Sequence, residues 1–413
     1  MIAALAVVAA GALTSPALAQ PGQLDPRFGK KGVAVLPVSA ALALKTLQQP
    51  DGKLLVDAPA DTNSAKIVRL LPNGAVDTSF GTQGVVTLTV PNNVFSLQGD
   101  MQLQPDGAIV VLGVVNVPVH RGPLHHGVVA RFLANGTLDS SFGTNGVVQL
   151  TALGGAQTDS PRVLLLQPNG QILIADDFSS DQTSPLQVTR LNGDGSVDAG
   201  FGDAGIATIP GGTDGAPEAL ALQNDGKVLA IESTPTLASA TRLLRDGTID
   251  TDTTPGTVIA STAAQAQISV VPPLAVQSDD SYITERATGP QLQQFQLQRS
   301  TLTNSRDHSF KSPVIKYGPG IVNLSQDYAN LVQADGSILA VGRFFRAPNE
   351  YFGMARVLAN GALDASFGKN GEVLTAFPGN NALATAVGLQ ADGNIVVAGT
   401  SDGKLAVARY LGQ

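Results

Sequence analysis

Cysteine and tryptophan are absent from this sequence of 413 residues, and histidine and methionine occur only four and three times. Without cysteine, the chain forms no disulfide, no thiolate metal site and no cysteine nucleophile. Charged residues are also few, at 14%, and the net charge of −8 offers no basic stripe for phosphate groups. We therefore expect no nucleic-acid partner. The G-x-x-x-x-G-K-[ST] motif of phosphate-binding loops does not occur either.

What the sequence does contain is apolar residues and turn formers. Hydrophobic residues make up 43% of the chain, with 45 Gly and 25 Pro. A chain with this apolar fraction and no runs of like charge can bury a core, so it is globular rather than disordered. The many Gly and Pro residues indicate a fold that is rich in turns.

The first twenty residues, MIAALAVVAAGALTSPALAQ, have an apolar core followed by Pro16 and the small-residue pattern Ala17-Leu18-Ala19. This pattern predicts a signal peptide over residues 1–19, although no Lys or Arg precedes the apolar core. An N-terminal membrane anchor is the alternative, but the apolar run is shorter than the ~20 residues that a span needs. We expect no transmembrane span, and a mature protein that is periplasmic or secreted.

One stretch of sequence, D-x-x-F-G-x-x-G, returns throughout the chain. Its Asp recurs at intervals of 52 to 62 residues, in seven copies. The seven positions are Asp25, Asp77, Asp139, Asp198, Asp250, Asp307 and Asp364. An Arg stands eight residues before the Asp in six copies: Arg69, Arg131, Arg190, Arg242, Arg299 and Arg356. A turn resembling Gln-Pro-Asp-Gly also occurs seven times, beginning at Gln49, Gln104, Gln167, Gln223, Gln277, Gln333 and Gln390.

Each repeat unit reads as β structure. Residues 84–136, for example, alternate short β-branched runs with the turns Pro-Asp-Gly and Ala-Asn-Gly. Asp-Gly and Asn-Gly between apolar runs are strong hairpin signals, because such turns need a positive φ. We therefore predict an all-β fold with about four antiparallel strands per unit. Seven such units favour a single seven-bladed β-propeller over residues 20–413, with a pair of smaller domains as the alternative.

The two ends of the chain complement each other. The last Arg of the series, Arg409, has no Asp after it, and the first Asp, Asp25, has no Arg before it outside the predicted signal peptide. This register predicts a ring closed between the N- and C-terminal segments, with Arg409 paired to Asp25. Residues 24–36 should then lie beside residues 404–411.

The repeated residues have structural roles that suit a propeller. An Arg on an apolar strand needs a partner, and the Asp that keeps step with it is the expected one. The repeated Phe should pack between one blade and the next. The repeated Gln should satisfy backbone groups near its hairpin. The alternative interpretation is a ring of Arg or Asp side chains that lines a channel and binds an ion, although equal copies suit architecture better than a site.

Seven copies of this pattern resemble the delta-60 repeat family of bacterial β-propellers, which has no assigned general function. The resemblance is most specific in RLLPNGAVDTSFGTQG, RFLANGTLDSSFGTNG and RVLANGALDASFGKNG, and it covers residues 20–413. It implies an exported propeller and identifies no catalytic residue. Two units depart from the pattern: the unit of Arg242 and Asp250, the fourth counted by its Arg, loses the Phe and the first Gly, and the next unit, of Arg299 and Asp307, has Lys311 in place of the first Gly.

Few residues offer chemistry. His120, His125 and His126 are the candidates for a metal site, although no carboxylate stands between them, and a solvated loop is the simpler interpretation. Asp176-Asp177 and Glu232 replace small residues of other units, and we expect them to face the loops at strand ends. The sequence thus predicts no catalytic residue, no cofactor and no metal site beyond these three His.

Two functions remain open. The first is a monomeric, non-enzymatic binding or scaffold module for a protein or an extracellular polysaccharide. The alternative is a propeller enzyme, a lyase or hydrolase, acting on an extracellular substrate at one channel mouth. The scarcity of His, the absence of Cys and Trp and the symmetry of the repeated polar residues favour the first.

Overall fold

The computed structural model describes residues 20–40, 43, 45–58, 65–90, 93–96, 100–117, 124–150, 161–177, 185–209, 216–233, 237–252, 256–261, 275–276, 281–288, 294–301, 307–312, 315–316, 329–346, 348–379 and 381–412. These residues form 29 strands and no helix, which confirms the all-β prediction. Within this part of the chain, accordingly, no helix has the length and apolar character to cross a membrane.

The strands are organised as antiparallel sheets, most of them with four strands. The N-terminal half holds a nine-stranded sheet, which comprises β2 (Thr46–Gln48), β3 (Leu54–Asp57), β4 (Ala65–Leu70), β5 (Val85–Val90), β6 (Asn93–Ser96), β7 (Met101–Leu103), β8 (Ile109–Val117), β9 (Leu124–Phe132) and β10 (Val147–Gln149). Two units are merged in this sheet, because β6 pairs with both β5 and β8.

The following sheets each contain four strands in chain order. They are β11 (Val163–Leu166), β12 (Ile172–Asp177), β13 (Leu186–Leu191) and β14 (Ile206–Ile209); β15 (Ala216–Leu222), β16 (Val228–Ser233), β17 (Leu237–Leu243) and β18 (Thr257–Ser261); β19 (Ala275–Val276), β20 (Tyr282–Thr288), β21 (Gln294–Ser300) and β22 (Ile315–Lys316); and β23 (Ala329–Val332), β24 (Ile338–Arg346), β25 (Asn349–Val357) and β26 (Glu372–Thr375).

The last sheet joins the two ends of the chain. Its order is β1 (Val33–Ser39), β29 (Lys404–Tyr410), β28 (Ile395–Ser401) and β27 (Ala382–Leu389), so the N-terminal strand pairs with the C-terminal one. Val33 lies opposite Ala408, and the Gly22 amide donates to the Leu411 carbonyl at 2.7 Å. The prediction that residues 24–36 lie beside the C-terminal strand is therefore confirmed.

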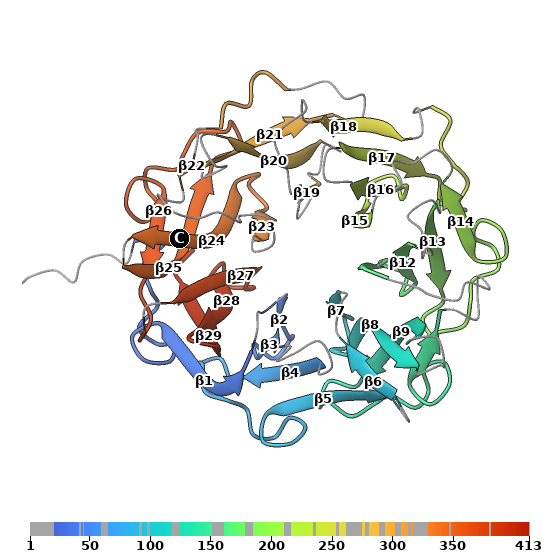
Figure 1. Cartoon of the computed structure of the whole chain (residues 1–413), viewed down its shortest axis with the longest axis horizontal. Coiled ribbons are helices and arrows are strands. Elements are labelled where there is room, and N and C mark those ends of the chain that lie inside the picture. Colours follow the sequence, from blue (N-terminus) through green and yellow to red (C-terminus); the bar gives the residue numbers. More distant parts are fainter. Residues whose placement is uncertain are drawn as a thin grey trace, which may run out of the picture.

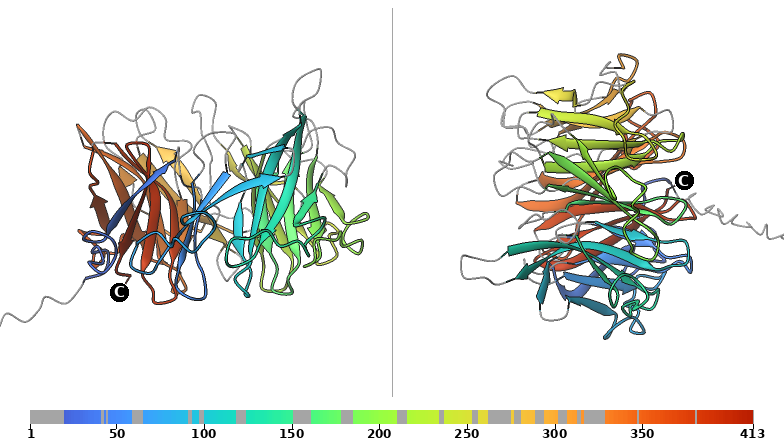
Figure 2. Two further views of the ribbon diagram at one scale, coloured as in Figure 1. Left: turned by 90° about the horizontal axis from the view of Figure 1, so that it is seen from below. Right: turned by 90° about the vertical axis from the view of Figure 1, so that its right-hand side faces the viewer.

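The sheets stand around a common centre (Figure 1). The first strand of each unit, such as β2, β7, β15, β23 and β27, lies nearest the centre, and strands such as β5, β14, β18 and β1 lie outside. Seen from the side, the sheets form one layer whose strand ends meet two opposite faces (Figure 2). The sequence did not predict which strand of a unit lies innermost. The arrangement shows that it is the strand that precedes the Gln hairpin.

The hydrophobic core lies between neighbouring sheets. One cluster joins Val56 and Val68 of the first unit to Val396 and Val407 of the last sheet, with Phe28 among them. Strands with apolar residues on both faces, such as β28, whose residues are all buried, can pack against a sheet on each side. This packing on both faces explains why strands such as β28 contain continuous apolar runs in the sequence.

The repeated Arg and Asp form an ion pair in every unit; we refer to these as the Arg–Asp pairs. Their shortest N–O distances run from 2.5 to 2.9 Å. The pairs are Arg69–Asp77, Arg131–Asp139, Arg190–Asp198, Arg242–Asp250, Arg299–Asp307, Arg356–Asp364 and Arg409–Asp25. The predicted pairing is confirmed, including the pair between the chain ends, which we call the terminal pair.

The same Arg also binds the next unit. Arg69 donates to the Ala134 carbonyl at 2.6 Å, Arg190 to Arg245 at 2.6 Å, and Arg356 to Gly412 at 2.8 Å. Arg409 continues the series by donating to the Pro72 carbonyl of the first unit at 2.5 Å. These guanidinium groups therefore join their own Asp to the turn of the following unit.

The repeated Phe residues are buried under these guanidinium groups. Phe28, Phe80, Phe142, Phe201 and Phe367 are 0% exposed and Phe310 is 3% exposed, as predicted. The guanidinium carbon lies 4.3 to 5.1 Å from the ring centroid in the six units that have a Phe. A Cβ added at Gly74 of the following turn would lie 3.0 Å from the Phe28 ring, so the turn needs glycine there for space as well as for its φ of +84°.

The two atypical units keep the Arg–Asp pair but lose parts of its surroundings. Asp250 of the fourth unit, which has no Phe, gains a second cation from Lys227 at 2.8 Å. In the fifth unit Lys311 lacks the positive φ of the glycine that it replaces, yet its amide still donates to the Asn360 carbonyl at 3.2 Å. The ion pair is thus the most constant element of the repeat among the residues described.

Candidate binding site between the first, second and last units

The repeated Gln hairpins lie on one face, at the inner end of the sheets. In each described copy the Asp or Asn side chain accepts the backbone N–H two residues further on, as Asp392 does from Asn394 at 3.0 Å. The other copies are Asp51, Asp106, Asn169, Asp225 and Asp335. This local bond fixes the turn, so the Asp of the hairpin is occupied by its own backbone.

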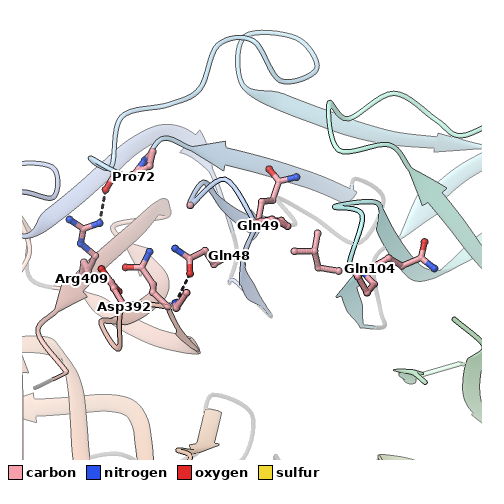
Figure 3. A pocket seen from close by; sticks show the side chains of 12 residues that line it. Gln48, Gln49, Pro72, Gln104, Asp392 and Arg409 are labelled. Atoms are coloured by element: carbon pink, nitrogen blue, oxygen red, sulfur yellow. Dashed lines mark hydrogen bonds between the residues drawn. The ribbon is translucent and has the colours of Figure 1, made fainter. Parts of the chain in front are cut away.

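A cavity of about 550 Å³ opens between three of these hairpins. It lies where the first, second and last units meet, next to the chain ends (Figure 3). Its walls are Gln48, Gln49, Pro50, Gly52, Pro72, Leu103, Gln104, Pro105, Gln390, Ala391, Asp392 and Arg409. The walls are rich in amide side chains and proline rings, and they hold one carboxylate and one guanidinium.

Arg409 differs from the other six Arg residues of the series. In those six the Nε atom donates to the Asp, as in Arg131, whose Nε lies 2.7 Å from Asp139 Oδ2. The others are Arg69, Arg190, Arg242, Arg299 and Arg356. In the terminal pair it is Nη2 of Arg409 that lies 2.9 Å from Asp25 Oδ2, and Nε is buried without a hydrogen-bond partner.

The terminal pair also differs in the residue two positions after its Asp, which is Arg27. Four other units have a Ser at this position, such as Ser141, whose hydroxyl donates to Oδ1 of Asp139. Arg27 instead forms two bonds of 2.9 Å, from Nε to Asp25 Oδ1 and from Nη2 to Oδ2. Asp25 therefore serves two guanidinium groups, and Arg409 reaches it through Nη2 alone.

The electrostatics of the terminal pair favour the charged forms. Burial by itself would raise the pKa of Asp25, but the hydrogen bonds from Arg27 and the charge of Arg409 hold that pKa below its ordinary value. The carboxylate is therefore ionised at neutral pH, and it balances part of the positive charge beside the cavity.

Gln390 supplies a second unsatisfied group to the same cavity. Its residue is 4% exposed, and its Oε1 has no hydrogen-bond partner. Gln49 of the first unit, by contrast, donates from Nε2 to the Ala134 carbonyl at 3.2 Å. Gln167 and Gln223 also have unpaired buried atoms, so the expected role of the repeated Gln in satisfying the backbone holds for Gln49 but not throughout.

The rim of the cavity is held by a bond between units. The Ala391 amide donates to Oε1 of Gln48 at 2.7 Å, which ties the hairpin of the last unit to β2. Asp392 is exposed at this rim, whereas Arg409 is 7% exposed at the cavity wall. The cavity thus has a buried donor and acceptor inside and an acidic side chain at its entrance.

The predicted histidine cluster lies mostly outside the described residues. His120 falls outside them, as does the side chain of His125, whose backbone belongs to β9. His126 is half-buried on β9 opposite Val115, and its Nδ1 has no hydrogen-bond partner. Among the described residues no three His, Asp or Glu side chains gather as they would around a metal ion.

The prediction that the extra acids face the loops is wrong for two of them. Asp176 on β12 and Glu232 on β16 are 1% and 3% exposed, and Ser239 donates to Glu232 at 2.7 Å. Both strands lie second from the centre of their sheets, so the adjacent strand and the neighbouring unit cover these side chains. The side chain of Asp177 lies outside the described residues.

The cavity itself was not predicted from the sequence. The repeated Gln, Asp and Arg were assigned structural roles, and those roles hold in most units. Two signals were available: Arg27 stands where other units have Ser, and Arg409 is separated in sequence from its Asp. Neither signal says that three hairpins leave a space between them.

Comparisons with known proteins identify the fold. A solved streptogramin B lyase is similar over 92% of this chain and 97% of its own, at 12% identity and a TM-score of 0.52. A catalytically inactive variant of virginiamycin B lyase from Staphylococcus aureus, solved with quinupristin, is similar over 92% and 98%, at 11% identity and a TM-score of 0.50. At such identities the likeness shows the β-propeller fold alone.

No curated protein matches the sequence. A family model described as "Domain of unknown function (DUF5122) beta-propeller" matches residues 49–80, 104–142, 167–201 and 333–367. Each match runs from a Gln hairpin to the Phe of the D-x-x-F-G stretch or just past it, and therefore covers the strands and turns that form one Arg–Asp pair. Four units of this chain thus match a β-propeller repeat family of unknown function.

Proposed function

We propose that the chain is a single seven-bladed β-propeller of delta-60-like repeats, whose ring is closed by β1 beside β29. The pairing of β1 with β29, the terminal pair and the bond from Arg409 to Pro72 support this closure. Such a closure leaves no open sheet edge between the first and last units. Separating the ends should therefore destabilise the whole ring rather than one blade.

We propose further that the protein is exported and acts as a binding or scaffold module for a protein or an extracellular polymer. One observation carries the binding role. The repeated Arg and Asp are paired in the other six units through the Arg Nε, but beside the cavity a buried donor of Arg409 and a buried acceptor of Gln390 remain unsatisfied. Leaving such groups buried and unpaired costs about 1–3 kcal/mol each, and a ligand that pairs them recovers this energy.

The walls of the cavity suit binding better than catalysis. They hold one carboxylate, Asp392, which is bound to its own turn, and a guanidinium that is paired to Asp25. General acid–base catalysis needs a positioned group that is free to exchange a proton with the substrate, whereas both of these side chains are engaged by the protein. The alternative, a propeller lyase or hydrolase, would show itself by turnover of the bound ligand.

The test is to fill the cavity with a large side chain. Ala391 lines the cavity in the sequence Gln-Ala-Asp-Gly, and Ala334 has the same sequence context in another hairpin and is also exposed. The variant Ala391→Trp should abolish binding, and Ala334→Trp should retain it. Thermal shift against neutral peptides, oligosaccharides and divalent metals measures this, because a ligand of the native state raises the melting temperature. If no ligand of any class depends on Ala391, the binding role of this cavity is wrong.

Export is tested separately at the N-terminus. We propose that residues 1–19 are removed on export, so the mature protein begins at Gln20. N-terminal sequencing of the protein recovered from the periplasm or the medium should read Gln-Pro-Gly-Gln. A protein that stays with the cells and begins at residue 1 would contradict the proposal.

A further inference from the structure

We infer that the cavity binds an uncharged, extended peptide segment, with Arg409 and Gln390 paired to one backbone amide unit of the ligand. The inference rests on the proposed binding function and specifies its ligand. It follows from three properties of the cavity: the pair of unsatisfied groups, their charge, and the chemistry of the remaining walls.

The first property is complementarity to an amide. Arg409 Nε is a buried donor without an acceptor, and Gln390 Oε1 is a buried acceptor without a donor. Both residues line the same cavity of about 550 Å³. A ligand that satisfies both must carry a C=O and an N–H, and each peptide unit of an extended chain presents one of each. The volume falls within the roughly 300–1,000 Å³ of pockets that bind small ligands.

The second property is charge. Arg409 and Arg27 share the carboxylate of Asp25, and the exposed carboxylate of Asp392 supplies a second negative charge, so two positive and two negative charges lie at or beside the cavity. An anionic ligand would also meet the exposed carboxylate of Asp392 at the rim and a protein whose net charge is −8. A neutral ligand pairs the free Nε–H without bringing an uncompensated charge into the site.

The third property is the composition of the walls. Pro50, Pro72 and Pro105 contribute ring faces without an N–H, and Leu103 adds an apolar side chain. None of the described residues that line the cavity is aromatic, whereas sugar rings are commonly held on aromatic faces. Amide side chains from Gln48, Gln49 and Gln104 complete the lining and can bond to further backbone groups. These walls favour a polypeptide over a polysaccharide.

The site exists at one unit boundary because of Arg27. Where Ser stands at this position, the Arg Nε bonds to the Asp and is not available, as in Arg69, Arg131 and Arg356. Replacing Arg27 by Ser should free Asp25 Oδ2, so that Arg409 Nε turns to Asp25 as in the other units. Arg27 does not line the cavity, so it acts as a positioning residue.

The experiment uses the full chain without residues 1–19 and a library of N-acetylated, C-amidated tetrapeptides made without Asp, Glu, Lys or Arg. Retained peptides are identified by mass spectrometry, and the affinity of the best one is measured by calorimetry. We expect retention by the wild-type protein and by Ala334→Trp, and none by Ala391→Trp. Gln390→Leu and Arg27→Ser should each lower the affinity roughly three- to tenfold, the effect of one net hydrogen bond.

A spectroscopic readout separates the role of Arg27 from a merely structural one. The ¹⁵N resonance of Arg409 Nε should shift when the peptide is added to the wild-type protein, and it should already be shifted in free Arg27→Ser. Retention of peptides by Ala391→Trp, or of none by the wild-type protein, would overturn the inference. If neutral oligosaccharides bind instead and Ala391→Trp abolishes this, the peptide inference fails while the binding role of the cavity stands.

Discussion

The Arg131–Asp139 pair and the terminal pair are built from the same two residue types, yet they leave different groups free. Arg131 donates a hydrogen bond from Nε to Asp139 and another from Nη1 to the Gly193 carbonyl of the next unit. In Arg409, Nη2 pairs with Asp25 and Nη1 donates to the Pro72 carbonyl, whereas Nε is unpaired. In the repeat, then, a pair within one unit can be complete and purely structural, whereas the pair that joins the chain ends is not.

The difference lies in one residue after the Asp. Ser141 adds a single hydroxyl bond to Asp139, whereas Arg27 adds two charged bonds to Asp25, and beside them the Nε of Arg409 is unpaired. Asp25 of the terminal pair therefore accepts more charged hydrogen bonds than Asp139 does, whereas the Nε of Arg409 has no hydrogen-bond partner. The comparison teaches that symmetric architecture and an asymmetric site can share the same ion pair.

Lowering the pH should have the largest effect on stability, because it protonates the Asp of every Arg–Asp pair. The pKa of Asp77 is lowered from 3.8 to about 2: burial opposes this, but the bonds from Ser79 and the charges of Arg69 and Lys53 prevail. A pKa below the value of the unfolded chain means that the stabilisation is complete above about pH 4 and is lost as the pH falls toward 2. The free energy of unfolding, followed from pH 5 to pH 2, should fall steeply in this window.

Two variants compare an internal Arg–Asp pair with the terminal pair in this pH dependence. Asp77→Asn should weaken the pH dependence by removing one carboxylate whose pKa is depressed, and Asp25→Asn should do so as well. The melting temperature in buffers of decreasing pH measures both. An unfolding free energy that is independent of pH between 5 and 2 would contradict the role of the pairs.

The next largest effect concerns the buried rings. Phe142 and Phe28 are both 0% exposed, one within the chain and one at its N-terminal end. Phe142→Ala and Phe28→Ala should each cost about 3–5 kcal/mol, as truncations of buried aromatic residues do. Denaturant unfolding measures both, with Leu133→Ala, at 44% exposure, as a control expected within about 0.5 kcal/mol of the wild type. A Phe28→Ala variant as stable as that control would show that the N-terminal segment does not belong to the core.

Breaking the ion pairs should distinguish the two regions directly. Removing one partner of a buried pair costs about 3–5 kcal/mol. Because the side chains of Arg131 and Asp139 keep 13% and 14% exposure, we expect about 2–4 kcal/mol for Arg131→Met. Arg409→Met should cost less, since Arg27 still neutralises Asp25. Adding Arg27→Ser to Arg409→Met should remove this difference, and a double variant no less stable than Arg409→Met would refute the sharing of Asp25.

A glycine comparison separates space from backbone strain. Gly74 and Gly170 have similar φ values of +84° and +86°, which cost a residue with a Cβ about 1–2 kcal/mol. A Cβ at Gly74 would also lie 2.9 Å from the Gly29 amide nitrogen, whereas one at Gly170 meets nothing within 4 Å. Gly74→Ala should therefore cost at least about 1 kcal/mol more than Gly170→Ala. Equal losses in thermal unfolding would mean that the N-terminal segment does not pack closely on the first unit.

The smallest effect concerns the hairpin glutamines. Gln333 accepts a bond from Ser337 at 2.9 Å, and Gln390 Oε1 accepts none. Gln333→Leu should therefore cost about 0.5–1.5 kcal/mol, and Gln390→Leu should leave the stability of the free protein unchanged or slightly higher. A clear loss of stability in Gln390→Leu alone would indicate that this side chain is satisfied in the free protein.

Much of the fold could be predicted from the repeat, because one short pattern carries several constraints. The Gly residues predict turns, the Phe predicts a buried ring, and an Arg in an apolar strand requires a partner that the Asp supplies. The burial of Asp176 and Glu232 could not be predicted in this way. A side chain at a strand end is exposed or covered according to the neighbouring unit, and local sequence does not describe that neighbour.

By itself, the sequence determined the β structure, the period of the repeat and the pairing of Arg with Asp, including Arg409 with Asp25. These features depend on spacing along the chain and on the few turns that Gly and Asp permit. Only the tertiary structure decided that three hairpins leave a cavity, and that Arg409 shares Asp25 with Arg27 and keeps its Nε unpaired. The reason is physical: a cavity is what neighbouring units fail to fill, and which atom of a shared ion pair stays free depends on distances between segments about 380 residues apart.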